Sequence, residues 1–255
     1  MVKTYAYGFP RIGKNREYKK TIEGFWKENI SQEELIRALD RIDIKNRRTY
    51  AHNVDDYPTN EMTMYDKMLD TAIMVGLYSP EDANEYYDLC RGKDCLEMTK
   101  WFNTNYHYLV PDFTKWDNPE FKYSVKMSLD SNNPHLIGPF TFLKLSKGIP
   151  ENKFRDYALQ LAEVYKEIIS DFDTVHFDEP AFTMDLGLQN KEVYTIKEMY
   201  DIIADSDSKV NVFTYYEDVD WFSNFVMDLP VNGIGIDFVN GRKSYDRLLD
   251  LGKFP

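Results

Sequence analysis

The stretch Val175-His176-Phe177-Asp178-Glu179-Pro180 is a short apolar run that ends in two carboxylates and a proline. Such a run is typical of a buried β-strand that leads into a loop. An amphipathic helix is predicted just before it, because apolar residues recur at helical spacing from Phe154 to Ile168. A second short apolar run, His135 to Pro139, precedes that helix. Strand, helix and strand therefore follow one another, which predicts parallel strands.

The same alternation continues toward the C-terminus, with strands expected over 210–215 and 234–239 and helices over 191–204, 221–227 and 244–251. The four strand starts lie 24 to 39 residues apart, at Leu136, Val175, Val210 and Ile234. This spacing suits right-handed βα units that feed a parallel sheet. Polar or glycine-proline residues follow each strand, at the end where a barrel builds its site, and they favour a TIM-type (βα)8 barrel over an open sheet.

The N-terminal half is predicted to add two strands, over Thr4–Phe9 and within His52–Asn60. Helices are expected there over 16–27, 31–48, 64–75 and 80–89. The helix at 31 starts with Ser31-Gln32-Glu33-Glu34, which has the form of a capping box. Six βα units are therefore found where a complete barrel needs eight. We predict an α/β fold, a single domain over 1–255 in the form of an incomplete TIM-type barrel.

Composition sets limits on the partners of this chain. Its 31 basic and 43 acidic residues give a net charge of -12, which argues against nucleic acid or an anionic membrane as partner. The apolar runs are too short to cross a bilayer, and residues 1–10 lack a signal-peptide pattern, so a cytoplasmic location is expected. Cys90 and Cys95 fit neither a zinc knuckle nor a redox pair, and free thiols are expected.

Charge is unevenly distributed, because residues 1–48 hold 12 basic and 7 acidic side chains in an otherwise acidic chain. Five of these cations surround the start of the first predicted helix: Arg11, Lys14, Arg16, Lys19 and Lys20. Arg16 and Lys19 are three residues apart and share a helix face, so they could hold one multivalent anion. A solvated basic helix is the alternative interpretation.

Carboxylates near strand ends are the second group of candidate site residues. Period-two alternation points His176 and Asp178 to one side of their strand and Phe177 and Glu179 to the other. Asp237 lies late in another predicted strand. These acids could be catalytic, or they could accept hydrogen bonds that hold the rim together. A small barrel glycoside hydrolase, with Asp178 or Glu179 as acid and Asp237 as base or nucleophile, is one possible reading.

Other common site patterns are missing from the sequence. The histidines at 52, 107, 135 and 176 have no paired spacing, so no zinc signature is visible. There is no nucleophile elbow, no phosphate-binding P-loop and no dinucleotide-binding glycine motif after the first strand. We expect no metal site in this chain.

Several motifs together resemble the N-terminal barrel of the cobalamin-independent methionine synthase family. The matching stretches are 8–13 (Gly-Phe-Pro-Arg-Ile-Gly), 16–20 (Arg-Glu-Tyr-Lys-Lys), 98–108 (Met-Thr-Lys-Trp-Phe-Asn-Thr-Asn-Tyr-His-Tyr), 138–142 (Gly-Pro-Phe-Thr-Phe), 178–181 (Asp-Glu-Pro-Ala) and 235–239 (Gly-Ile-Asp-Phe-Val). They follow the family order over nearly the whole chain.

This resemblance implies a methyltransferase of two barrels. The C-terminal barrel would hold zinc and activate the thiol of homocysteine, and the N-terminal barrel would help to bind the polyglutamate tail of 5-methyltetrahydrofolate. The family's tail-binding positions fall on Arg16, Glu17, Tyr18, Lys19 and Lys100. The basic first helix suits that anionic tail.

The sequence departs from the family pattern in ways that limit what the resemblance implies. It ends before a C-terminal zinc barrel, so we expect no zinc and no methyl transfer from this chain alone. It also stops after its sixth strand and is short between Phe121 and Gly138. The expected partners are 5-methyltetrahydropteroyl polyglutamate and a C-terminal catalytic barrel, or a second copy joined through open sheet edges. A structural remnant that binds nothing is a further alternative.

Overall fold

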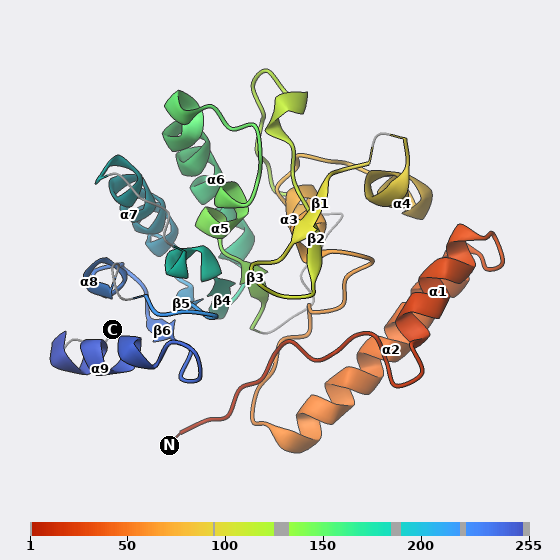
Figure 1. Cartoon of the computed structure of the whole chain (residues 1–255), viewed down its shortest axis with the longest axis horizontal. Coiled ribbons are helices and arrows are strands. Elements are labelled where there is room, and N and C mark those ends of the chain that lie inside the picture. Colours follow the sequence, from red (N-terminus) through yellow and green to blue (C-terminus); the bar gives the residue numbers. More distant parts are fainter. Residues whose placement is uncertain (1, 94, 125–132, 185–189, 220–222, 252–255) are drawn as a thin grey trace.

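The computed structural model of the chain describes residues 2–93, 95–124, 133–184, 190–219 and 223–251 (Figure 1). The helices in these ranges are α1 (Glu17–Trp26), α2 (Gln32–Asn53), α3 (Lys67–Met74), α4 (Ala83–Arg91), α5 (Pro139–Lys144), α6 (Phe154–Ile169), α7 (Asn190–Ala204), α8 (Ser223–Val226) and α9 (Arg242–Leu251). The strands are β1 (Met98–Lys100), β2 (His107–Leu109), β3 (His135–Ile137), β4 (Thr174–Asp178), β5 (Lys209–Phe213) and β6 (Gly233–Gly235). The predicted deletion between Phe121 and Gly138 lies largely outside these ranges.

A parallel sheet in the order β3-β4-β5-β6 forms the centre of the fold. Each of its strands had been expected from an apolar run, and the alternation of strand and helix is confirmed. Val175 and Phe177 of β4 are fully buried, and α6 and α7 pack side by side next to the sheet (Figure 1). The Tyr165 hydroxyl of α6 donates to the Ile137 carbonyl of β3 at 2.7 Å. Consecutive βα units thus share one core.

The two strands predicted in the N-terminal half are wrong as strands. Among the described residues, they are represented by one isolated parallel bridge between Tyr5 and Asp56. The Asp55 carboxylate accepts hydrogen bonds from the Thr4 backbone N–H and hydroxyl at 2.8 Å each, so a side chain occupies groups that a ladder would use. Gly8 then takes a left-handed backbone conformation, with φ 83°, and ends the extended segment.

The N-terminal helices follow their sequence signals closely. The predicted capping box is confirmed, because the Glu34 N–H donates to Ser31 Oγ at 3.2 Å and the Ser31 N–H donates to the Glu34 carboxylate at 2.8 Å. The helix predicted from 80 starts later, at Ala83, because Asp82 accepts from the Glu85 N–H at 2.9 Å. Helices α1 and α2 pack against each other as a helical hairpin (Figure 1).

The observed arrangement is an α/β fold with a parallel sheet and is consistent with a TIM-like domain. Within the described ranges, β3 and β6 each pair with one neighbouring strand only. The closed ring of a barrel is not seen in this part of the chain. No helix of the described residues is both long and apolar enough to cross a membrane.

Candidate functional site

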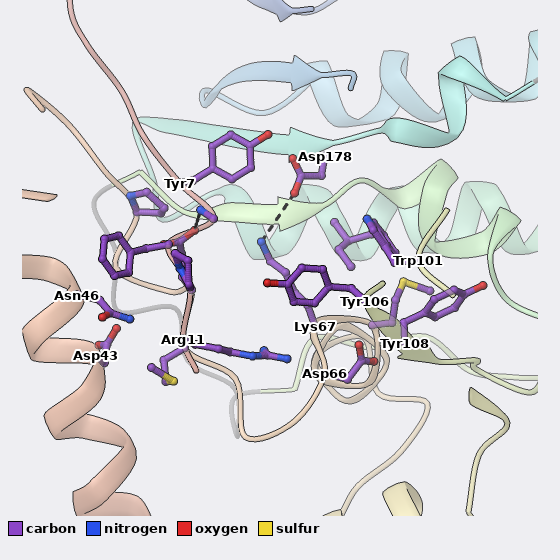
Figure 2. A pocket seen from close by; sticks show the side chains of 18 of the residues that line it. Tyr7, Arg11, Asp43, Asn46, Asp66, Lys67, Trp101, Tyr106, Tyr108 and Asp178 are labelled. Atoms are coloured by element: carbon purple, nitrogen blue, oxygen red, sulfur yellow. Dashed lines mark hydrogen bonds and ion pairs between the residues drawn. The ribbon is translucent and has the colours of Figure 1, made fainter. Parts of the chain in front are cut away.

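A cavity of about 490 Å³ lies at the C-terminal ends of β3 and β4 (Figure 2). Ile137 and Asp178, the last residues of these strands, both line it. The C-terminal ends of parallel strands are where α/β proteins most often build ligand sites. The cavity is also lined by the loop at 7–11, by the start of α3 and by the β1–β2 hairpin.

A buried polar network lies behind the wall of this cavity and reaches it through Asp178, Lys67 and Tyr7. His135 is fully buried, and its Nε2 lies 2.5 Å from Asp178 Oδ1. Its Nδ1 lies 3.2 Å from the Tyr5 hydroxyl. Burial lowers the pKa of His135, so the ring is neutral, and the network assigns Nε2–H as donor to Asp178 and Nδ1 as acceptor from Tyr5.

Asp178 is ionised in this network although it is buried. Burial by itself would raise the pKa of its carboxyl, but His135, Lys67 and Tyr7 together outweigh that effect and hold the pKa below its usual value. Lys67 Nζ lies 3.9 Å from Asp178 Oδ2. Tyr7 stacks on the His135 ring with the ring centres 3.8 Å apart. Figure 2 shows Tyr7 and Lys67 directed toward Asp178.

A second carboxylate of the cavity, Asp66, has a structural role. It is the N-cap of α3, and it accepts hydrogen bonds from the N–H groups of Leu69 at 2.8 Å and Leu109 at 3.2 Å. Burial raises the pKa of Asp66 to about 6, against the opposing effect of these hydrogen bonds. Asp66 thereby joins α3 to strand β2 and fixes the hairpin over the cavity.

The predicted pair Asp178 and Glu179 is split by the alternation of β4, as the sequence indicated. Glu179 is fully buried on the opposite side, where its carboxylate accepts from the N–H groups of Phe140 at 3.0 Å and Thr141 at 2.7 Å. The Tyr200 hydroxyl donates to it at 2.8 Å. Glu179 therefore caps α5, and it does not line the cavity.

Asp237 also organises a loop. Its carboxylate accepts from the N–H groups of Tyr216 at 3.1 Å, Val239 at 2.8 Å and Asn240 at 2.9 Å. It is not among the residues that line the cavity. The structure thus favours the rim-holding interpretation for Glu179 and Asp237, and it brings no second candidate acid from the predicted set to Asp178.

Four of the predicted tail-binding positions, Arg16 to Lys19, lie at the N-cap and in the first turn of α1 and do not line the cavity, whereas Arg11 of the predicted basic cluster does line it. Arg16 and Lys19 are exposed, and Lys19 forms an ion pair with Glu23 at 3.4 Å. Glu17 accepts from the Asn15 N–H at 2.8 Å, which lowers the pKa of its carboxyl together with its own backbone hydrogen bond. Arg16 is the N-cap, in a left-handed conformation with φ 60°, so the prediction that it shares a helix face with Lys19 is wrong. Solvent and a ligand can reach Arg16 and, on α1 itself, Lys19 and Lys20.

Tyr18 is buried and anchors this helix to the rest of the domain. Its hydroxyl donates to the Met64 carbonyl at 3.0 Å. The Arg11 guanidinium lies over the Tyr18 ring, 5.1 Å from its centre, and donates to the Tyr65 carbonyl at 2.6 Å and to the Thr63 hydroxyl. These contacts fix the direction in which α1 leaves the GFPRIG loop.

Lys100 lies on β1, where it pairs with His107 of β2 in an antiparallel hairpin. Its side chain is exposed and forms no ion pair within the described ranges. The long aromatic segment is thus a hairpin whose tip carries Trp101 and Tyr106 over the cavity (Figure 2).

The sequence interpretation missed Lys67, Tyr5 and Tyr7 as parts of a site. Alternation in Tyr5-Ala6-Tyr7 places both rings on one side of the chain, which was an available signal. Lys67 gave none, because its partner Asp178 is distant in sequence. Within the described residues, no group of three or more His, Cys, Asp or Glu side chains could hold a metal ion. Cys90 is buried, Cys95 is exposed and both are free.

Comparison with known proteins gives consistent matches. Residues 3–254 match the family described as "Cobalamin-independent synthase, N-terminal domain". A 5-methyltetrahydropteroyltriglutamate–homocysteine methyltransferase of Thermotoga petrophila is 36% identical over 266 residues, which cover 95% of this chain and 35% of the relative. The enzymes of the same name from Thermotoga maritima and Bacillus licheniformis are 36% and 34% identical over 282 residues. These two alignments cover the whole chain and 37% and 36% of the relatives. The chain thus spans just over a third of their length.

Proposed function

The chain belongs to the cobalamin-independent methionine synthase family, as its N-terminal domain, and we propose that it binds the polyglutamate tail of 5-methyltetrahydrofolate for methyl transfer to homocysteine. The relatives are named for a triglutamate substrate. The single observation that supports tail binding best is the exposure of both Arg16, at the N-cap of α1, and Lys19, in its first turn. An anionic tail needs cations that remain accessible, and this helix presents them.

We assign direct contact with the tail to Arg16, Lys19 and Lys100. Glu17 and Tyr18 act differently in this proposal. Tyr18 is buried and holds α1 against residues 63–65, and Glu17 orders the first turn of the helix through Asn15. Both therefore position the cations and do not need to touch the ligand.

Zinc has no place in what we propose for the described residues, because no set of ligands for it comes together there. Activation of a thiol at neutral pH needs such a metal or a comparable positive centre. We therefore propose that methyl transfer requires a C-terminal catalytic barrel, and that this domain contributes binding. A cytoplasmic location fits this role.

We further infer that the domain is a βα barrel of the TIM type. Its sheet edge at β6 is covered by a neighbouring domain or subunit. In the isolated domain we propose that this neighbour is a second copy, which takes the place that a C-terminal catalytic barrel would have in a longer protein. Phe238 and Val239, just after β6, are 62% and 86% exposed, which supports an interaction at this edge. Light scattering on the 255-residue chain should show self-association. A monomer with rapidly exchanging β3 and β6 amides would contradict this inference.

Tail binding is tested by comparing mono- and triglutamyl 5-methyltetrahydrofolate in calorimetric titrations at low salt. The triglutamate should bind more tightly, and Lys19→Ala should reduce that preference by about two- to fivefold, because exposed charge contacts are weak. Lys153→Ala is a matched control, since Lys153 is similarly exposed and forms a comparable ion pair with Asp156. Equal affinities for both tail lengths in all three proteins would exclude the site.

A further inference from the structure

We propose that the cavity beside Asp178 is a second binding site, for a small organic carboxylate that carries an aromatic or apolar body. Its volume of about 490 Å³ is within the range of small-molecule sites. Neither Arg16 nor Lys19 lines it, so this proposal does not depend on tail binding by α1.

Aromatic side chains form much of the cavity wall. Rings from the N-terminal segment, from the hairpin and from the loop after β5 face the same space: Tyr7, Trp101, Tyr106, Tyr108 and Tyr216. Walls of this kind bind flat or apolar groups through burial and ring stacking. The aromatic wall therefore predicts that the main part of the ligand is aromatic or apolar.

The charged side chains of the cavity indicate which polar group of the ligand it would bind. Each carboxylate in the lining already has close partners. Asp178 binds His135, and Asp43 forms an ion pair with Arg47 at 2.6 Å. Asp66 accepts two backbone N–H groups, and Glu61 accepts from the Tyr50 hydroxyl at 2.6 Å.

Two cations of the lining are less well compensated. Arg11 donates to neutral oxygens of Thr63 and Tyr65. Burial raises the pKa of the Asp66 and Asp70 carboxyls and the charge of Arg11 acts to lower it, but within the described residues no carboxylate lies close enough to form an ion pair with Arg11. Lys67 has one long contact of 3.9 Å, to a carboxylate that His135 already holds. Figure 2 shows both side chains reaching into the cavity. An incoming carboxylate could therefore accept charge-assisted hydrogen bonds from both cations, whereas the carboxylates of the lining already accept hydrogen bonds within the protein.

The mouth of the cavity is held in a strained conformation. Phe102, next to Trp101 in the hairpin, and Tyr216, in the loop after β5, have φ values of 50° and 86°. Their rings contact each other, with centres 5.4 Å apart. Two non-glycine residues in left-handed conformations at one contact are unusual, and such strain is concentrated at ligand sites. The contact fixes the hairpin tip above the strand ends.

The test compares 4-aminobenzoate with its neutral analogue 4-aminobenzamide, by calorimetry and by amide chemical shifts on the 255-residue chain. The acid should bind about tenfold more tightly than the amide, because only the acid forms charge-assisted hydrogen bonds. The amide chemical shifts of residues that line the cavity should change on binding. Binding of the acid no tighter than the amide would overturn the proposal.

Two variants separate the head group from the body of the ligand. Lys67→Met should weaken binding of 4-aminobenzoate about tenfold and leave 4-aminobenzamide unchanged. Lys144→Met is the control, since Lys144 is also partly buried in an ion pair, with Glu192 at 3.2 Å. Tyr106→Ala should weaken both probes, and Tyr194→Ala neither, although these tyrosines are 67% and 69% exposed. Unchanged affinity in Lys67→Met or Tyr106→Ala would refute the site.

A final arm identifies the source of the ligand. Tighter binding of 4-aminobenzoyl-glutamate than of 4-aminobenzoate would indicate the corresponding part of a folate, and weaker binding would indicate a free acid. Either result supports the shared chemistry. The pair Arg16→Ala and Lys19→Ala should not alter binding of 4-aminobenzoate. A loss there would place the probe on α1 and overturn the cavity proposal, whereas failure of tail discrimination alone would leave it intact.

Discussion

Replacement of Glu179 by Gln should remove a pH dependence from the stability of this domain. Glu179 is fully buried, and burial raises the pKa of its carboxyl from 4.5 to about 7, against the effects of Thr141, Tyr200 and Phe140. A carboxyl with a raised folded-state pKa binds its proton more tightly in the folded than in the unfolded protein. Its contribution to stability is therefore full below pH 4.5 and is lost as the pH rises through 7.

The magnitude follows from the two pKa values. A carboxyl with a pKa near 7 when folded and 4.5 when unfolded changes the free energy of unfolding by about 3 kcal/mol between these limits. A Gln side chain does not titrate, so this pH dependence would be absent. Its NH₂ group would face one of the N–H donors that now bind a carboxylate oxygen, and that hydrogen bond would be lost. We expect Glu179→Gln to lose about 1 to 3 kcal/mol of stability at pH 5 and to show a flatter profile up to pH 8.

Urea unfolding followed by circular dichroism, at intervals from pH 4.5 to 8, measures both effects. Glu163→Gln, at an exposed position on α6, is the matched control and should follow the wild-type profile. Asp66 and Asp70, whose carboxyl pKa values burial raises to about 6 and about 7, titrate in all three proteins and cancel in the comparison. Parallel profiles for wild type and Glu179→Gln would refute the reasoning.

Three further predictions concern the cap, the basic helix and the metal. Gly138→Ala should destabilise the domain by about 2 kcal/mol or more in urea unfolding, because the added Cβ would lie 2.2 Å from the Glu179 carboxyl carbon; wild-type stability would contradict this. Glu23→Gln should strengthen binding of the triglutamyl folate about twofold in calorimetry, because it frees Lys19 from its ion pair; weaker binding would argue against Lys19 as a contact. The purified chain should hold no stoichiometric zinc by elemental analysis and should not methylate homocysteine, and turnover above background would overturn this expectation.

Features of this protein that depend on local pattern could be predicted without the structure. The apolar run that begins at Val175 and the helical repeat before it specified a parallel strand and its helix, because periodicity reflects which face is buried. The capping box at Ser31 was equally readable, since all its partners lie within one turn. Alternation also predicted correctly that Asp178 and Glu179 point to opposite sides of β4.

Contacts between groups that are distant in sequence could not be predicted, because they depend on how the elements pack. Nothing local distinguishes Glu179, a buried cap of α5, from a catalytic acid, because its donors come from another βα unit. Lys67 reaches Asp178 only because α3 and β4 are brought together by the fold. The N-terminal strand is reduced to a single bridge for a similar reason, since the Thr4 N–H bonds to the distant side chain of Asp55 while only its carbonyl accepts from the backbone of residues 55 and 56. A pattern gives the direction of a side chain, whereas its partner depends on long-range packing.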